Sequence, residues 1–152
     1  MVAACAFTGW TRALRLARRV EELEKFRSFL QALCTEIRFS AAPLGTLIRR
    51  NAGNASWLQS CAASLDQGVP FPEAWKQAAS SAAVARQDRM LLIEFGEGLG
   101  TSDIEGQTAH CALCAEKLDA LLTQACEDRA KKSRLYVTLG VSAGAVLGLL
   151  LM

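Results

Sequence analysis

The strongest chemical signal in the sequence is His110-Cys111-x-x-Cys114, because an imidazole and two thiols at this spacing are used in zinc binding and in disulfide exchange. A zinc site needs about four ligands, and the sequence has no second CxxC and no second histidine. A thioredoxin-type CxxC lies at the start of a helix after a strand, whereas these cysteines fall inside a predicted helix at consecutive apolar positions of a heptad. We therefore interpret them as structural, with a metal or redox protein as the less favoured alternative.

The remaining cysteines also fall into apolar patterns. Cys34 flanks Leu30, Cys61 follows Leu58, Cys126 follows Leu122 by one turn, and Cys5 belongs to the apolar start of the chain. We expect all of them to be free thiols, and Cys34, Cys61 and Cys126 to act as small hydrophobes on core faces.

A second candidate for chemistry is Gly96-Glu97-Gly98-Leu99-Gly100, which superficially resembles a phosphate-binding loop. It lacks the GK[ST] of a P-loop and the third glycine of GxGxxG, and it follows a predicted helix instead of a strand. We interpret these glycines as the end of a helix. His110 has no carboxylate one helical turn away to orient it, so we expect a solvated or rim histidine. The sequence thus predicts no catalytic residue, no cofactor, no metal and no enzyme, and a net charge of +2 gives no reason to expect a nucleic-acid partner.

The elements that hold these residues are predicted to be helices. The chain of 152 residues, 51% of them hydrophobic, is the size of one domain. Apolar residues recur at helical spacing, as in Leu23, Phe26, Leu30, Leu33 and Ile37, and Trp75, Met90, Leu91 and Phe95 are expected in the core. Ser102 and Glu105 indicate a capping box, with Ser102 at the N-cap. The sequence predicts an all-α bundle of about six helices over a domain at 12–134. The expected helices are 12–39, 43–50, a third with its apolar stripe at 57–65 that Gly68 stops, 71–81, 84–97 and one from 102 onward.

The C-terminal segment 135–152 is predicted to be a transmembrane helix. Its 18 residues carry no charged side chain and would span about 27 Å as a helix, close to the thickness of a bilayer core. The basic residues Lys131, Lys132 and Arg134 precede it, so the positive-inside rule keeps the preceding domain in the cytoplasm. Gly140, Gly144 and Gly148 form overlapping GxxxG patterns, which favour close packing with another membrane helix, including self-association. The alternative is a buried core helix.

The N-terminal segment 1–11 is apolar but too short to span a bilayer, and no basic residue precedes it as in a secretory signal. We interpret it as the end of a longer membrane helix. The alternatives are a small hydrophobic anchor and a frayed helix end.

Three stretches together carry a resemblance to a known family. They are Leu33-x-x-Glu36-Ile37-x-Phe39 leading to Pro43-Leu44; Phe95-Gly96-x-x-Leu99-Gly100-x-Ser102-Asp103-x-x-x-Gln107; and Lys132-x-Arg134-Leu135-Tyr136-x-x-Leu139-Gly140-x-x-x-Gly144. In this order and spacing the chain resembles the stage III sporulation protein AB family of endospore-forming bacteria, over nearly its whole length from about residue 12.

The resemblance implies a mother-cell membrane protein of the sporulation channel between mother cell and forespore, with its soluble domain facing the cytoplasm. It also implies a domain similar to the cytoplasmic domains of type II secretion F-type platform proteins, which are not enzymes. The partners it implies are a secretion-type ATPase like stage III sporulation protein AA, other membrane proteins of the channel, and the lipid bilayer. Family members usually begin with a full membrane helix, from which this chain departs. The runner-up is an F-like platform of a pilus or type II secretion system.

The middle motif has two interpretations. Its residues Phe95, Gly96, Leu99, Gly100, Ser102, Asp103 and Gln107 either build the corner between two helices or contact the partner directly. Glycines that end one helix and a capping residue that starts the next favour the structural interpretation.

Overall fold

The computed structural model describes the backbone of residues 2–40 and 42–150 and the side chains of residues 14–40 and 42–131. Over that part of the chain there are six α-helices, one 3₁₀ helix and no strand, which confirms the predicted all-α bundle. The elements are α1 (Val2–Phe39), α2 (Leu44–Asn51), η1 (Ala52–Asn54), α3 (Ser56–Asp66), α4 (Phe71–Ser81), α5 (Arg86–Gly98) and α6 (Ile104–Leu150). Their bounds agree with the predicted helices to within about two residues, except that α1 begins ten residues earlier than the predicted 12.

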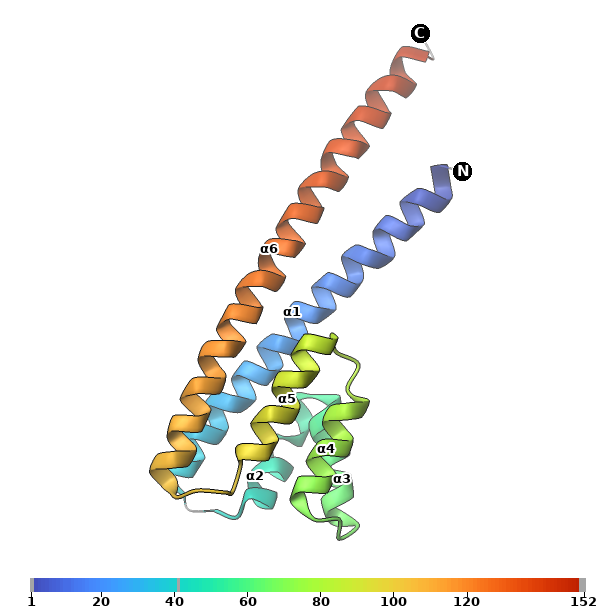
Figure 1. Ribbon diagram of the computed structural model, residues 1–152. Helices are drawn as coiled ribbons and strands as arrows, with labels where there is room; N and C mark the ends of the chain where they lie inside the picture. Colours follow the sequence, from blue (N-terminus) through green and yellow to red (C-terminus); the bar gives the residue numbers. More distant parts are fainter. Residues whose placement is uncertain (1, 41, 151–152) are drawn as a thin grey trace.

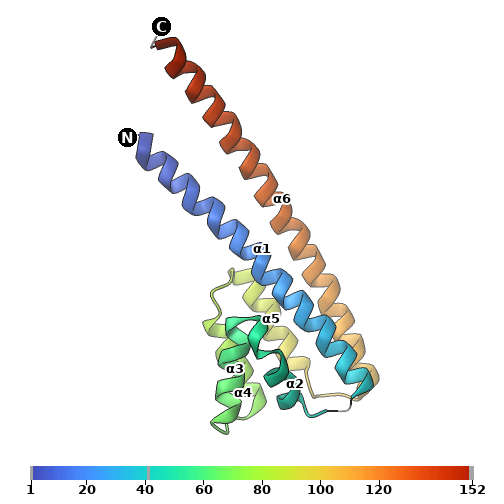
Figure 2. The ribbon, with the colours of Figure 1, turned by 180° about the vertical axis from the view of Figure 1, so that it is seen from behind.

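Two long helices form the spine of the molecule. α1 packs chiefly against α6, and the two run antiparallel (Figures 1 and 2). The short helices α2 to α5 pack beside the lower half of this pair and complete a compact body. Beyond the body, the first part of α1 and the last part of α6 project in the same direction. The two ends of the chain therefore lie at one end of the molecule, and the α1–α2 and α5–α6 connections lie at the other.

The pattern of buried residues explains why the long helices pair. Leu23, Phe26, Leu30 and Leu33 are buried along α1, at the spacing predicted from the sequence. The matching stripe on α6 consists of Cys111, Cys114, Leu118, Leu121 and Ala125. Along the stretches 20–33 and 111–125 most exposed positions of the two helices are charged, polar or small, so within the body the pair buries one face and solvates the other.

An aromatic cluster forms the centre of the body. Phe26 and Phe29 of α1 contact Trp57 of α3 edge to face, with ring centroids 5.7 and 5.6 Å apart. Trp57 in turn contacts Trp75 of α4 at 5.3 Å, and Trp75 contacts Phe95 of α5 at 5.8 Å. These edge-to-face pairs join four helices, and each is worth about 1 kcal/mol beyond its buried area.

Two expectations about the core are wrong. Met90 is 62% exposed, because the buried stripe of α5 passes through Asp88, Leu91, Leu92 and Phe95, which leaves position 90 on the far side of the helix. Cys126 is exposed, because it lies about 100° around α6 from the buried stripe that ends at Ala125.

The structure describes the backbone of most of the two predicted membrane segments but none of their side chains. α6 continues without a break to Leu150, and α1 begins at Val2, so the helical backbone crosses both predicted domain boundaries. The side chains of 1–11 and of 135–152, including Gly140, Gly144 and Gly148, lie outside the described residues. Among the residues that could be searched, none of the helices combines the length and the apolarity needed to cross a bilayer.

Candidate functional site

The corner between α5 and α6 contains most of the residues singled out from the sequence. The Leu99 N–H donates to the Gly96 carbonyl at 3.3 Å, and Leu99 is buried against the core. Gly100 follows with φ +77°, a left-handed conformation that favours glycine, and this turns the chain toward α6. The motif glycine at 100 is thus explained by backbone geometry.

Two glycines of α5 are required by close packing. The ring of Trp75 occupies the space that a Cβ on Gly96 would need, and the ring of His110 does the same at Gly98. Trp75 is held there because its Nε1 donates to the Leu92 carbonyl at 2.8 Å. The glycines therefore let an indole and an imidazole lie directly on the α5 backbone, which is a structural role and not phosphate binding.

His110 closes the end of α5. Its Nε2 lies 2.9 Å from the Phe95 carbonyl, one of the carbonyls in the last turn of α5 that lack a partner within the helix. Its ring stacks on Phe95 with centroids 5.5 Å apart and an interplanar angle of 3°. The histidine is half-buried at the rim, and its Nε2 is already engaged.

The thiols of the CxxC lie in the core. Cys111 and Cys114 are 1% and 3% exposed, and Cys111 lies beside Cys34 of α1. Burial raises the pKa of Cys111 to about 11 and that of Cys114 to about 12, so both remain protonated near neutral pH. Within the described side chains, no group of three or more histidine, cysteine or acidic residues is placed to hold a metal ion.

The start of α6 differs from the predicted capping box. The N-cap is Asp103 and not Ser102: Asp103 Oδ1 accepts from the Gly106 N–H at 2.9 Å, and the Asp103 carbonyl accepts from the Gln107 N–H at 2.9 Å. The Gln107 side chain donates to the Ser102 carbonyl at 2.9 Å. Asp103 was the better candidate because its carboxylate also favours the positive end of the helix. These polar motif residues therefore bind to the corner itself.

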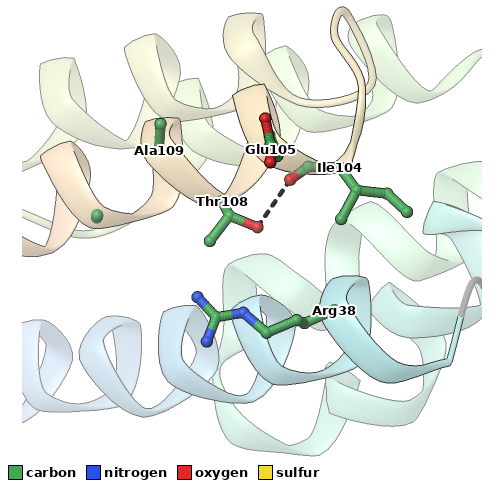
Figure 3. Close-up of a pocket in the computed structure, with 6 residues that line it drawn as sticks. Arg38, Ile104, Glu105, Thr108 and Ala109 are labelled. Carbon is green, nitrogen blue, oxygen red and sulfur yellow. Dashed lines mark hydrogen bonds between the residues drawn. The ribbon is translucent and has the colours of Figure 1, made fainter.

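A shallow apolar groove lies next to this corner, between the end of α1 and the start of α6 (Figure 3). Its volume is about 410 Å³, and its lining residues are Arg38, Ile104, Glu105, Thr108, Ala109 and Ala112. Thr108 contributes mainly its methyl group, because its hydroxyl donates to the Ile104 carbonyl at 2.7 Å. We call this surface the distal groove, since it lies at the end of the body away from the chain ends.

Two large apolar side chains at the ends of these helices are exposed. Ile104, which lines the groove, is 55% exposed, and Phe39, the last residue of α1 and the chain neighbour of the lining residue Arg38, is 81% exposed. A large aromatic residue left in water at the end of a helix that also lines an apolar groove is typical of an interaction surface. Sequence reasoning missed the groove, although Phe39 lies in one of the motifs that carry the family resemblance.

A charged cluster joins three helices where α1 and α6 leave the body. Arg19 of α1 donates from Nε and Nη2 to the two carboxylate oxygens of Asp88 in α5, both at 2.8 Å. Arg19 Nη1 also lies 4.0 Å from Asp128 of α6. Asp88 is 4% exposed, and its carboxylate raises the pKa of Arg19 above the usual value. The sequence offered no signal for this pair, because its members lie 69 residues apart.

Known proteins resemble this chain over its full length. A family model described as stage III sporulation protein AB matches residues 1–152. Stage III sporulation protein AB of Bacillus subtilis (strain 168) is 30% identical over 162 residues, which cover 100% of this chain and 95% of the relative. A solved structure titled stage III sporulation protein AB superposes with a TM-score of 0.66 at 24% identity over 75% of this chain and 98% of the other, which supports the fold.

Proposed function

Because the chain belongs to the stage III sporulation protein AB family, we propose that it is a membrane-anchored platform of the sporulation channel between mother cell and forespore. In this role the body recruits a secretion-type ATPase, similar to stage III sporulation protein AA, through the distal groove. The observation that carries the proposal is the antiparallel pairing of α1 and α6, which puts both chain ends at one end of the molecule and the groove at the other (Figure 1).

Three features support membrane anchoring at the end where the chain termini lie. The sequence 135–152 carries no charged side chain, and α6 is helical through most of it. Residues 2–11 of the apolar N-terminal segment belong to α1, which projects from the body in the same direction. Basic residues border both segments, as the positive-inside rule expects for a body in the cytoplasm. We place the protein in the mother-cell membrane. There the GxxxG patterns at Gly140, Gly144 and Gly148 would allow its helix to pack closely against a second copy or against other channel proteins.

The distal groove is the best supported surface for the ATPase. With the membrane at the opposite end, this part of the body lies away from the bilayer. The exposed Phe39 and Ile104 supply the apolar anchors that dominate protein interfaces, and Arg38 and Glu105 supply polar groups at the groove.

The proposed role is structural and not catalytic. His110 is engaged with the α5 backbone, and the two thiols of the CxxC are buried and protonated. These groups stabilise the corner and the core, which is the function of a rigid scaffold.

Co-purification from membranes with the candidate ATPase tests the proposal. We expect the double variant Phe39→Ser/Ile104→Ser to lower ATPase affinity at least about tenfold, the effect of losing a central apolar anchor. Met90→Ser is the control, since Met90 is apolar and 62% exposed but lies on α5, away from the end of α1 and the start of α6. Equal binding by the double variant and the control would place the ATPase elsewhere.

Sporulation of a deletion strain tests the role of the protein in the channel. We expect sporulating cells that complete engulfment and then stop. Normal spore yield in the deletion strain would refute the proposed function as a whole.

A further inference from the structure

Charge is distributed very unevenly along this chain. Residues 12–20 and 129–134 together contain eight basic and no acidic residues, whereas residues 21–128 contain nine basic and all fifteen acidic residues. The near-neutral total of +2 therefore hides a strongly basic pair of segments and an acidic body.

The fold brings the two basic segments to the same level. Arg19 lies 4.0 Å from Asp128, and Arg27 lies 3.1 Å from Asp119. Residue numbers on α6 therefore decrease along the pair as those on α1 increase. Continuing this antiparallel register one turn beyond Arg19 puts Arg15 level with about residue 132. The segments 12–20 of α1 and 129–134 of α6, more than 100 residues apart in sequence, thus lie at the same level, where the two long helices leave the body. We call 12–20 and 129–134 the basic collar.

Most basic side chains of the body face acids, whereas most of the basic collar side chains that the structure describes do not. Lys25 contacts Glu21 and Glu22, and Arg49 contacts Asp66. Arg15, Arg18 and Arg129 are exposed and have no ion-pair partner among the described side chains. All fifteen acidic residues lie among the described side chains. The side chains that are not described therefore contain no Asp or Glu that could pair with Arg15, Arg18 or Arg129.

The other two described basic residues of the collar, Lys131 and Arg19, each contact a carboxylate. Lys131 makes an exposed contact with Glu127 at 3.3 Å on its own helix, which is worth little in water. Arg19 is the exception, since it is bound to Asp88. Of the five basic collar side chains that the structure describes, four are therefore exposed to solvent.

We propose that the basic collar binds anionic phospholipid headgroups of the membrane in which the chain is anchored. This inference rests on the proposed membrane anchoring, and it adds the lipid class that the protein selects. A lipid surface fits better than another partner, because the collar lies between the body and the two apolar segments, at the depth of the headgroups. The same negative surface repels the acidic body, so the collar and the body together hold the distal groove away from the membrane.

The expected preference for anionic over zwitterionic lipid follows from the attraction between one basic residue and an anionic headgroup. The attraction of one basic residue to an anionic surface is worth about fivefold in local concentration. We therefore expect phosphatidylglycerol to be enriched about fivefold over phosphatidylcholine around the collar at low salt. In 0.5 M salt, where the screening length is about 4 Å, the preference should nearly vanish.

Energy transfer from tryptophan to dansyl-labelled lipid measures this preference. The full chain is reconstituted in phosphatidylcholine nanodiscs that contain a trace of dansyl-phosphatidylglycerol or of dansyl-phosphatidylcholine. Trp10, two residues before the collar, is the donor in a background where Trp57 and Trp75 provide a constant signal from the body. The test variant replaces Arg15, Arg18, Arg129 and Lys131 by glutamine. The control replaces four exposed basic residues of the body by glutamine and so has the same net charge: Arg27, Arg49, Arg50 and Lys76.

We expect the test variant to reduce the enrichment below twofold and the control to retain the fivefold value. Equal transfer to both lipids in the unmodified chain, or an equal loss in test and control variants, would overturn the lipid selection and leave anchoring intact. Transfer to neither lipid would show that the chain is not in the bilayer, and would refute the proposed function together with the inference.

Discussion

The ion pair between Arg19 and Asp88 gives the sharpest test of how the long helices are fixed to the body. It is bidentate, with both N–O distances 2.8 Å, and Asp88 is almost fully buried. We consider Arg19→Met, which leaves a buried carboxylate without its cation, Asp88→Asn, which leaves the guanidinium with a neutral acceptor, and the double variant with both changes.

The expected magnitudes follow from the difference in burial. Removing one member of a buried pair costs about 3–5 kcal/mol of unfolding free energy. Arg19→Met should fall in this range, because Asp88 is only 4% exposed. Asp88→Asn should cost less, about 2 kcal/mol, because Arg19 is 17% exposed and retains Asp128 at 4.0 Å. The double variant should recover part of the loss, since it buries no unpaired charge.

Unfolding of the reconstituted full chain by denaturant, followed by tryptophan emission, measures these differences. Trp57 and Trp75 are 3% and 2% exposed, so their emission reports loss of the body core. A Trp10→Phe background removes the signal of the N-terminal segment. Arg27→Met is the matched control, because its ion pair with Asp119 is half exposed and should be worth less than about 1 kcal/mol.

Two results would refute the reasoning about burial. Arg19→Met costing no more than Arg27→Met would mean that water reaches Asp88 freely. A double variant that loses the sum of the two single effects would mean that the two residues act independently and form no coupled pair.

Three further predictions concern the corner and the core. Asp103→Ala should lower the unfolding free energy by about 1 kcal/mol and Ser102→Ala by less than about 0.5 kcal/mol, measured by the same denaturation, because Asp103 holds the N-cap; the reverse order would reinstate Ser102 as the cap. Gly98→Ala should destabilise by about 1–3 kcal/mol, although alanine normally stabilises a helix, because the new methyl group would displace the His110 ring; a gain in stability would contradict this packing. Between pH 9 and 10 the unfolding free energy should fall by about 1 kcal/mol for each buried thiol, since burial raises the pKa of Cys61 from 9.0 to about 11 and the unfolded chain loses its proton first. Cys61→Ala should reduce this fall by the share of one thiol, about 1 kcal/mol, because Cys111 and Cys114 remain; an unchanged slope would refute the assignment.

Helix positions were predictable because the signals that set them are local. Pro43 and Pro70 precede the starts of α2 and α4, and Gly68, with φ +84°, ends α3 as expected from its residue type. Apolar spacing also identified the buried face of α1 correctly, from Leu23 to Leu33. Each of these features depends on residues within one or two helical turns.

The features that escaped prediction depend on residues far apart in the chain. Nothing near Arg19 indicates that Asp88 will neutralise it, because the pair exists only after α5 has packed against α1. A periodic pattern cannot fix which of several adjacent apolar residues points inward, so it predicts Met90 in the core. The helices packed against α5 decide which residues are buried, and they leave Met90 exposed. The distal groove likewise forms only where the ends of α1 and α6 meet.

The motif at the corner and the distal groove next to it therefore call for different experiments. Phe95, Gly96 and Leu99 are buried, and Asp103 and Gln107 bind to the backbone of the corner, so these residues are occupied by internal contacts. We expect their effect on a partner to pass through the position of Ile104, the first residue of α6 and part of the groove. A change in the corner is thus expected to reduce stability and partner binding together. Replacing Phe39, which is 81% exposed, should reduce partner binding alone, and that difference identifies the contact surface.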